Sequence, residues 1–246
     1  MCRALALLCF FAATLVASPV RAQPLVFDLS SHLIAITTGF SGTELLLFGA
    51  TEGEGDVIVT LRGPETTAVV RKKSRVAGIW INTERMSFSG VPAFYRVAAS
   101  RPLDQIAPSA LRARHQLGLD HLRLTAPADA PADLAPIFRA GLLRNQEARG
   151  FYSSDVGRVS FLGPRLFRTR VVLPANVPPG SYTVEVLLVR NGQVIAAQTT
   201  PMFVSKVGLG AEVYEFAHRH AALYGILAIL LAVLSGWGAG VAFRKA

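Results

Sequence analysis

Apolar residues are concentrated at the two ends of the chain, whereas the middle alternates short apolar and polar positions. At the N-terminus, Arg3 precedes an apolar stretch of 14 residues, 4–17, and Pro19 breaks the run shortly before Ala22. This order predicts a secretory signal peptide over residues 1–22, cleaved after Ala22. An uncleaved anchor is the alternative, but 14 residues fall short of the roughly 20 needed to span hydrocarbon.

The other apolar end predicts a transmembrane helix over residues 221–243. These 23 residues contain no charge, and a helix of that length rises far enough to cross a bilayer with some tilt. Tyr224 and Trp237 suit positions near the two interfaces, and Arg244 and Lys245 follow at once. The positive-inside tendency places a tail of residues 244–246 in the cytoplasm and the remainder outside it. We therefore expect a single-pass inner-membrane protein with a periplasmic domain.

Between the ends, short β-type runs separated by turn residues predict a mainly β fold, with one or two antiparallel, Ig-like sandwich modules. In the expected N-terminal module, residues 23–100, these runs are residues 32–37, 43–48, 56–62, 67–72, 76–82 and 94–99. The expected C-terminal module, residues 151–207, has Phe167, Thr169, Val171 and Leu173 on one face of a strand. It also has Asn191-Gly192 between two β-type runs, which is the strongest hairpin signal in the chain.

Residues 101–150 change character and predict a helical or loop connection between the β modules. The clearer helix begins with Asp133 as N-cap and carries Leu134, Ile137, Phe138 and Leu142 on one face, so that face should pack on a sheet. A further helix over residues 208–220 is expected to run on continuously into the span.

Three segments carry a resemblance to a known family. They are Gly78-Ile79-Trp80-Ile81-Asn82, the stretch from Leu173 to Gly180, and the pairs Tyr224-Gly225, Gly236-Trp237 and Phe243-Arg244 in the apolar C-terminal part. The chain resembles the alphaproteobacterial putative transmembrane protein family over essentially the whole mature sequence. The resemblance implies a membrane protein with a periplasmic domain and no assigned activity, associated with neighbouring permeases of the sulfite-exporter type. It supplies no catalytic residue.

Charge adds one candidate binding site. The chain has 25 basic and 16 acidic residues, an excess that favours loose attraction to anionic headgroups or polyanions, although nucleic acid is not expected as a partner in the periplasm. Arg71, Lys72, Lys73 and Arg75 put four positive charges within five residues and could hold a phosphate or acidic glycan. The alternative is an exposed strand edge on which these charges discourage strand addition.

Other patterns argue against enzymatic or metal chemistry. Both cysteines, Cys2 and Cys9, lie in the predicted signal peptide, so the mature chain would have no thiolate. Glu52, Glu54 and Asp56 alternate with glycines but lack calcium-loop spacing, and His218 and His220 are two apart, which on a helix points them to different sides. No nucleophile signature is present. We expect no catalytic site, no metal and no cofactor.

The span itself carries the remaining candidate site. Ala232, Gly236 and Gly240 recur at four-residue intervals, and small residues on one face allow close helix approach in lipid. The favoured hypothesis is an accessory protein packed through this face against another inner-membrane protein, of transporter type. Two alternatives stay open, which are a periplasmic binding module for an anionic envelope ligand and a hydrolase whose site the sequence does not reveal.

Overall fold

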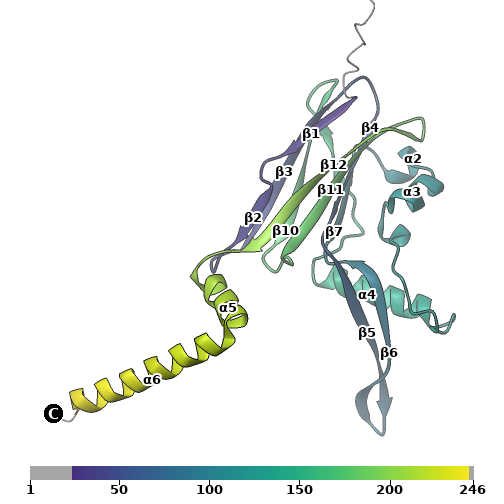
Figure 1. Ribbon diagram of the computed structural model, residues 1–246. Helices are drawn as coiled ribbons and strands as arrows, with labels where there is room; N and C mark the ends of the chain where they lie inside the picture. The colour runs from purple at the N-terminus through teal and green to yellow at the C-terminus, as the bar shows by residue number, and fades with distance from the viewer. Residues whose placement is uncertain (1–23, 244–246) are drawn as a thin grey trace, which may run out of the picture.

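The computed structural model describes residues 24–243, and within them the side chains of 209–212, 215, 242 and 243 are left aside. The predicted signal peptide and the basic tail therefore lie outside the described residues. The chain forms a β-sandwich from which a long hairpin and a C-terminal helix project (Figure 1).

Two sheets make up the sandwich. The first has the strand order β1-β3-β10-β9 and the second the order β2-β12-β11-β4-β7-β8. The first sheet contains β1 (Leu25–Leu29), β3 (Gly42–Thr51), β9 (Ser160–Phe161) and β10 (Leu166–Pro174). The second contains β2 (Leu33–Ile36), β4 (Asp56–Arg62), β7 (Tyr95–Ala99), β8 (Gly157–Arg158), β11 (Gly180–Arg190) and β12 (Gln193–Lys206). Pairing is antiparallel except that β2 runs parallel to β12, and β8 parallel to β7.

The expected division into a β module over 23–100 and another over 151–207 does not describe these sheets, because each sheet takes strands from both ranges. β10 pairs with β3 along its whole length, and β11 pairs with β4. Neither half forms a complete sheet alone, since each central strand has one neighbour from its own half and one from the other. One sandwich, not two, results.

The core lies between the two sheets, where alternating side chains interdigitate. The first sheet contributes Leu45, Leu47, Phe167 and Leu173, each almost fully buried. The predicted inward face of β10 is confirmed, because Phe167, Thr169, Val171 and Leu173 are buried while the intervening arginines are not. Turn chemistry closes the β11–β12 hairpin as expected, with Asn191 and Gly192 both at positive φ, 51° and 73°.

The second sheet is covered on its outer face as well, which explains why β4 and β11 read as continuous apolar runs. The cover is an insert of short helices, α2 (Leu103–Ile106), α3 (Ser109–His115) and the 3-10 turn η2 (Leu119–His121). Leu103, Ile106 and Leu117 join the main core from this insert. The predicted connection over 101–150 is thus a packed layer.

The 14-residue helix α4 (Ala135–Ala148) is the predicted amphipathic helix with corrected details. Its N-cap is Leu134 with no side-chain capping bond, so Asp133 does not cap it. Phe138 and Leu142 are buried, whereas Ile137 is 57% exposed. The buried pair packs on the base of a two-stranded ribbon and not on the sandwich, forming a second apolar cluster with Val70, Met86 and Phe88.

That ribbon is a projecting hairpin of β5 (Glu65–Val76) and β6 (Ile79–Pro92), which we call the arm. The expected strand over 76–82 is wrong, because Ala77 and Gly78 both take positive φ, 50° and 85°, and form the turn that reverses the chain. At the other side of the molecule, α5 (Leu209–Arg219) and α6 (Ala221–Phe243) follow β12. They are not one continuous helix, since His220 between them has φ −129° and ψ 52° and the axis bends there (Figure 1).

Candidate functional site

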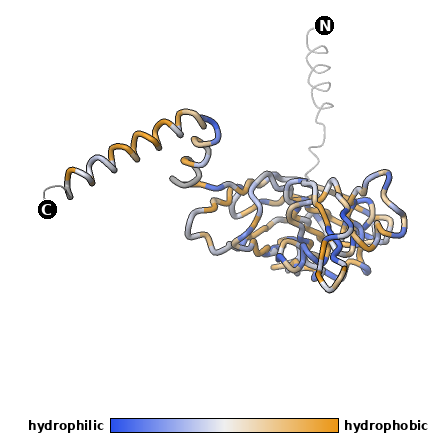
Figure 2. The backbone as a smooth tube through the Cα atoms, turned by 90° about the horizontal axis from the view of Figure 1, so that it is seen from below, coloured by the Kyte–Doolittle hydropathy of each residue, from blue (hydrophilic) through white to orange (hydrophobic). Residues whose placement is uncertain are grey.

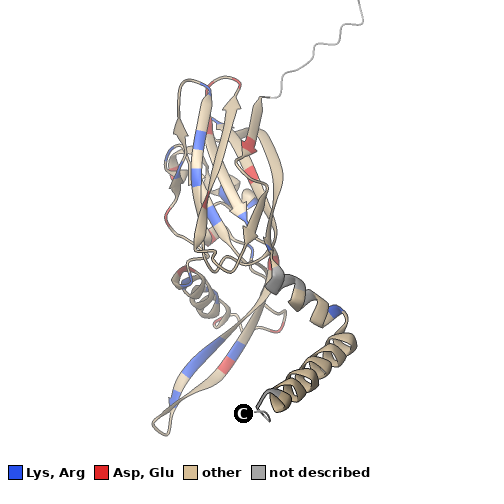
Figure 3. Cartoon of the chain, turned by 90° about the vertical axis from the view of Figure 1, so that its left-hand side faces the viewer, with Lys and Arg blue, Asp and Glu red and all other residues tan. Residues whose placement is uncertain are grey.

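Two surfaces project from the sandwich and carry the candidate site residues, namely the arm and α6. They leave the sandwich at the same end, as the views in Figures 1 and 3 both show. The insert and a groove beside it form the other polar region of the molecule.

The arm carries the predicted basic cluster. Arg71, Lys72, Lys73 and Arg75 are all exposed on β5, and Figure 3 shows the cationic stretch along the arm. Lys72 pairs with Glu84 of β6 at 3.2 Å, and the Nε atom of Arg75 donates to the carbonyl oxygen of Gly78 at 3.3 Å. Because successive side chains of a strand point to opposite faces, the four cations surround the arm and do not converge on one pocket.

Beyond an isolated bridge between Ser89 of β6 and Thr125, the outer edges of the arm have no strand partner among the described residues. The second interpretation of the basic cluster, protection of a strand edge against pairing with another chain, therefore fits this geometry too. Neither interpretation accounts for the apolar residues at the end of the arm.

The helix α6 coincides with the predicted span, and Figure 2 shows it as a strongly apolar helix that stands away from the folded domain. Residues 221–241 are long and apolar enough to cross a membrane, and none of that segment is buried within the described chain. Ala232, Gly236 and Gly240 lie on it at four-residue spacing. A Cβ atom added at Gly236 or Gly240 would meet nothing within 4 Å, so the described chain leaves this face open.

The comparison with protein families decides the class of the chain. Residues 24–245 match the model of a family described as "Putative transmembrane protein (Alph_Pro_TM)". The chain belongs to this family. The resemblance noted from the sequence is therefore confirmed, and with it a membrane protein of mainly β architecture. No curated protein matches the chain.

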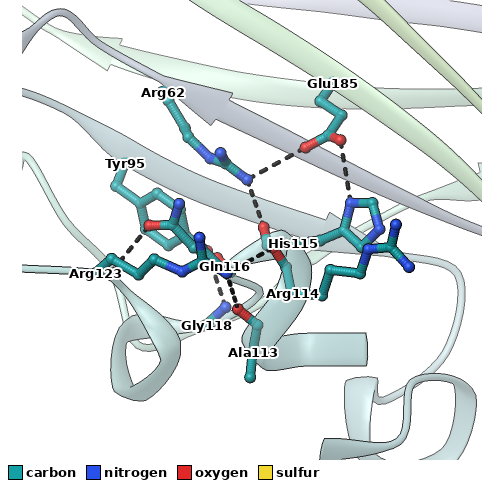
Figure 4. Close-up of polar contacts among 9 residues, drawn as sticks. All are labelled: Arg62, Tyr95, Ala113, Arg114, His115, Gln116, Gly118, Arg123 and Glu185. Atoms are coloured by element: carbon teal, nitrogen blue, oxygen red, sulfur yellow. Dashed lines mark hydrogen bonds and ion pairs between the residues drawn. The ribbon is translucent and has the colours of Figure 1, made fainter. Parts of the chain in front are cut away.

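In this member of the Alph_Pro_TM family, a half-buried polar network joins the insert to the second sheet (Figure 4). The carboxylate of Glu185 on β11 accepts from Arg62 of β4 at 3.2 Å and lies 3.2 Å from Nδ1 of His115. Arg62 also donates to the carbonyl oxygen of His115. No serine or cysteine takes part in these hydrogen bonds. Arg62, Glu185 and His115 lie on β4, β11 and α3, so their contacts hold the insert on the sheet, and we call these three residues the clamp.

Tyr95 holds the insert on the sheet as well. Its hydroxyl donates to the carbonyl oxygen of Gln116 and accepts the backbone N–H of Gly118 at 2.8 Å (Figure 4). Burial raises the pKa of Tyr95 to about 12, so the phenol stays protonated at neutral pH and keeps both bonds. This network could not be predicted from the sequence, because its members are far apart along the chain and meet only when the insert packs on the second sheet.

An open groove of about 870 Å³ lies between the insert, α4 and β8. Its lining includes Asp104, Asp120, His121, Glu147 and Arg158. This groove is a place in the described chain where the hydrolase alternative could have its site. Among the described residues no three His, Cys, Asp or Glu side chains gather closely enough to hold a metal ion.

Two other residues weighed in the sequence analysis, Asp56 and His218, have structural partners. Asp56 of the glycine-rich loop accepts hydrogen bonds from Ser100 at 2.9 Å and from Nε of Arg101 at 2.8 Å. The Arg101 guanidinium holds the pKa of the Asp56 carboxyl below its usual range. His218 Nδ1 lies 2.9 Å from the carbonyl oxygen of Tyr214. These contacts are of the kind by which polar residues stabilise a fold. The expectation that the protein is not an enzyme stays a prediction.

Proposed function

We propose that this protein is an exported, single-pass accessory protein of the inner membrane. In this proposal the sandwich lies in the periplasm, α6 crosses the bilayer, and the C-terminus is cytoplasmic. The domain is held beside another inner-membrane protein, of transporter type, on which it acts by binding.

The observation that supports this proposal best is the separation of α6 from the folded domain. The apolar segment 221–241 has no buried part within the described chain, although burying such side chains in an apolar medium is strongly favourable. Lipid and neighbouring helices are the surroundings that satisfy a charge-free helix of this length. The family to which the chain belongs is described as transmembrane, which agrees with that placement.

The open face of α6 supports a helix partner. Without a hydrophobic driving force between helices in lipid, close packing over small residues is a main source of association. Ala232, Gly236 and Gly240 offer such a face, and a Cβ at either glycine would enter open space. The partner's helix would then lie directly against the backbone of α6.

Affinity capture from detergent extract tests this proposal. We expect wild-type full-length protein to recover a membrane protein, and Gly236→Leu with Gly240→Leu to lose it, because two isobutyl groups would hold the helices apart. Gly238→Leu is the matched control, since residue 238 is also open but points to another side of the helix. Recovery of no membrane partner, or equal recovery by all variants, would refute the accessory role.

A second candidate function is a binding module for a soluble anionic envelope ligand. The exposed cations of β5 favour it. Retention of the full-length protein on an immobilised acidic glycan should fall when Arg71, Lys72, Lys73 and Arg75 are all changed to Glu. Unchanged retention would remove this candidate.

A further inference from the structure

The end of the arm carries large apolar side chains with no cover. Val76, Ile79, Trp80 and Ile81 are 49%, 67%, 66% and 45% exposed. Strand pairing places Val76 opposite Ile79, Ser74 opposite Ile81, and Arg75 opposite Trp80. One face of the ribbon end therefore carries Val76, Ile79 and Ile81, and the other carries Trp80 beside Arg75. We call Val76, Ile79, Trp80 and Ile81 the arm tip.

The arm is held firmly at its base, so the tip has a defined direction. Val70, Met86 and Phe88 pack with Phe138 and Leu142 of α4. From the pair Val70 and Met86 to the turn, the ribbon extends about 20 Å at the usual rise per residue. A ribbon anchored in this way presents its end residues away from the sandwich (Figure 1), where they do not join its core.

Behind the tip, the arm is a cationic shaft. Residues 71–85 include five basic side chains and a single acidic one, Glu84, which is paired with Lys72. Basic residues next to an exposed tryptophan and aliphatic side chains are typical of segments that lie in the membrane interface. The cations attract anionic headgroups, and the indole ring favours the headgroup level.

The position of the arm agrees with a lipid partner. The arm and the helices α5 and α6 leave the sandwich at the same end (Figures 1 and 3). A bilayer crossed by α6 therefore faces the end of the domain from which the arm extends. A protein surface would match the apolar tip, but the cationic shaft and the position of the arm at the same end as the span favour anionic lipid.

We propose that the arm tip inserts into the headgroup layer of the membrane that α6 spans, with the basic shaft contacting anionic lipids. This inference rests on the membrane anchorage of the proposed function. It gives the domain a second contact with the bilayer, so that the sandwich is held at a fixed orientation and does not swing on α6 alone.

Fluorescence of Trp80 in the full-length chain tests the proposal directly. Trp237→Phe leaves Trp80 as the single tryptophan. The protein is reconstituted in nanodiscs of phosphatidylglycerol and phosphatidylethanolamine, with acyl chains brominated near the headgroup. We expect bromine to lower Trp80 emission about twofold, because an indole at the interface touches the upper acyl chains. Aqueous acrylamide should quench it weakly.

A matched control places the only tryptophan elsewhere on the domain. In the variant Val172→Trp with Trp80→Phe and Trp237→Phe, the reporter stands on the outer face of β10, where Val172 is 64% exposed. Its emission should respond to acrylamide and not to bromine. Quenching of Trp80 by acrylamide alone, as in this control, would overturn the proposal.

The contribution of the basic side chains to membrane insertion is measured by changing the lipid composition and by charge-reversal variants. Bromine quenching of Trp80 should weaken in nanodiscs of neutral phosphatidylcholine, and equally when Arg71, Lys72, Lys73 and Arg75 become Glu. Absence of quenching in every lipid, together with protection of Trp80 from acrylamide in native membranes, would identify a protein partner and refute lipid insertion.

Failure of this inference is distinguishable from failure of the anchorage. Resistance of the full-length protein to alkaline carbonate extraction reports α6, whatever the tip does. Loss of bromine quenching with carbonate resistance retained would overturn the tip insertion alone. Extraction by carbonate would overturn both.

Discussion

Gly141 of α4 faces Val70 of β5, and a Cβ atom built on the glycine would lie 3.7 Å from the Cγ1 atom of Val70. This is ordinary van der Waals contact, so the helix approaches the arm as closely as one methyl group allows. The direction of the arm therefore depends on a small residue at one position of α4.

Enlarging this residue should loosen the arm. Gly141→Ala should be neutral or stabilise by up to about 1 kcal/mol, because alanine favours the helix. Gly141→Leu should destabilise by about 1–3 kcal/mol through overpacking. Thermal unfolding of the full-length protein in detergent measures both. Ala140→Leu, at an exposed neighbouring position, is the control, and equal losses at 140 and 141 would contradict the close contact.

Removing the Tyr95 hydroxyl should release the insert from the second sheet. Tyr95→Phe keeps the ring, which packs edge-on to Tyr152 at 6.0 Å between centroids, but loses the two bonds to Gln116 and Gly118. The expected cost is about 1–3 kcal/mol, since the carbonyl oxygen and N–H are left without that partner. Hydrogen exchange at residues 109–121 should rise. Tyr214→Phe, at an exposed ring, should change neither quantity.

Stability should fall in acid through Asp56. Because Arg101 lowers the folded-state pKa of Asp56, the contribution is present above the unfolded value of about 4 and is lost as the pH falls through the lower folded value. Asp56→Asn should therefore lower the melting temperature at pH 7 and have little effect near pH 2. Melting curves across this range provide the check, with Asp155→Asn as control. A constant difference at all pH values would show that charge plays no part.

The turn of the arm offers a change in the stabilising direction. Ala77 has φ 50°, a conformation that costs an alanine about 1 kcal/mol and that asparagine tolerates in this type of two-residue turn. Ala77→Asn should slow hydrogen exchange of the distal arm amides by several-fold, whereas Gly78→Ala should accelerate it. Faster exchange in Ala77→Asn would show that the turn has a different conformation in solution.

Local sequence pattern was enough to predict most individual strands and the C-terminal helix. Asp56–Arg62 agrees with β4 residue for residue, and the Asn191-Gly192 turn lies where its φ preferences place it. Both features depend on neighbouring residues only, so a single sequence contains the whole signal. The open face at Gly236 and Gly240 also follows from spacing on one helix.

Features that depend on distant contacts were not predictable in this way. The pairing of β10 with β3 merges two expected modules, yet no property of either strand names its partner. The turn at Ala77-Gly78 was missed because alanine rarely adopts positive φ, so residues 76–82 read as one strand. The exposure of Ile79 and Trp80 was not predictable either, because an apolar run in a strand does not tell a buried face from an uncovered one.

The order of strands also sets when the domain can fold. β12 ends at Lys206, with only α5 between it and the apolar helix α6, and it pairs with both β2 and β11. The N-terminal strand β2 therefore has no strand partner until β12 has been synthesised, because this pairing joins segments far apart in the chain. In the export that we propose, the sandwich can close only when nearly all of it has left the translocation channel, so completion of the domain comes shortly before the anchor follows.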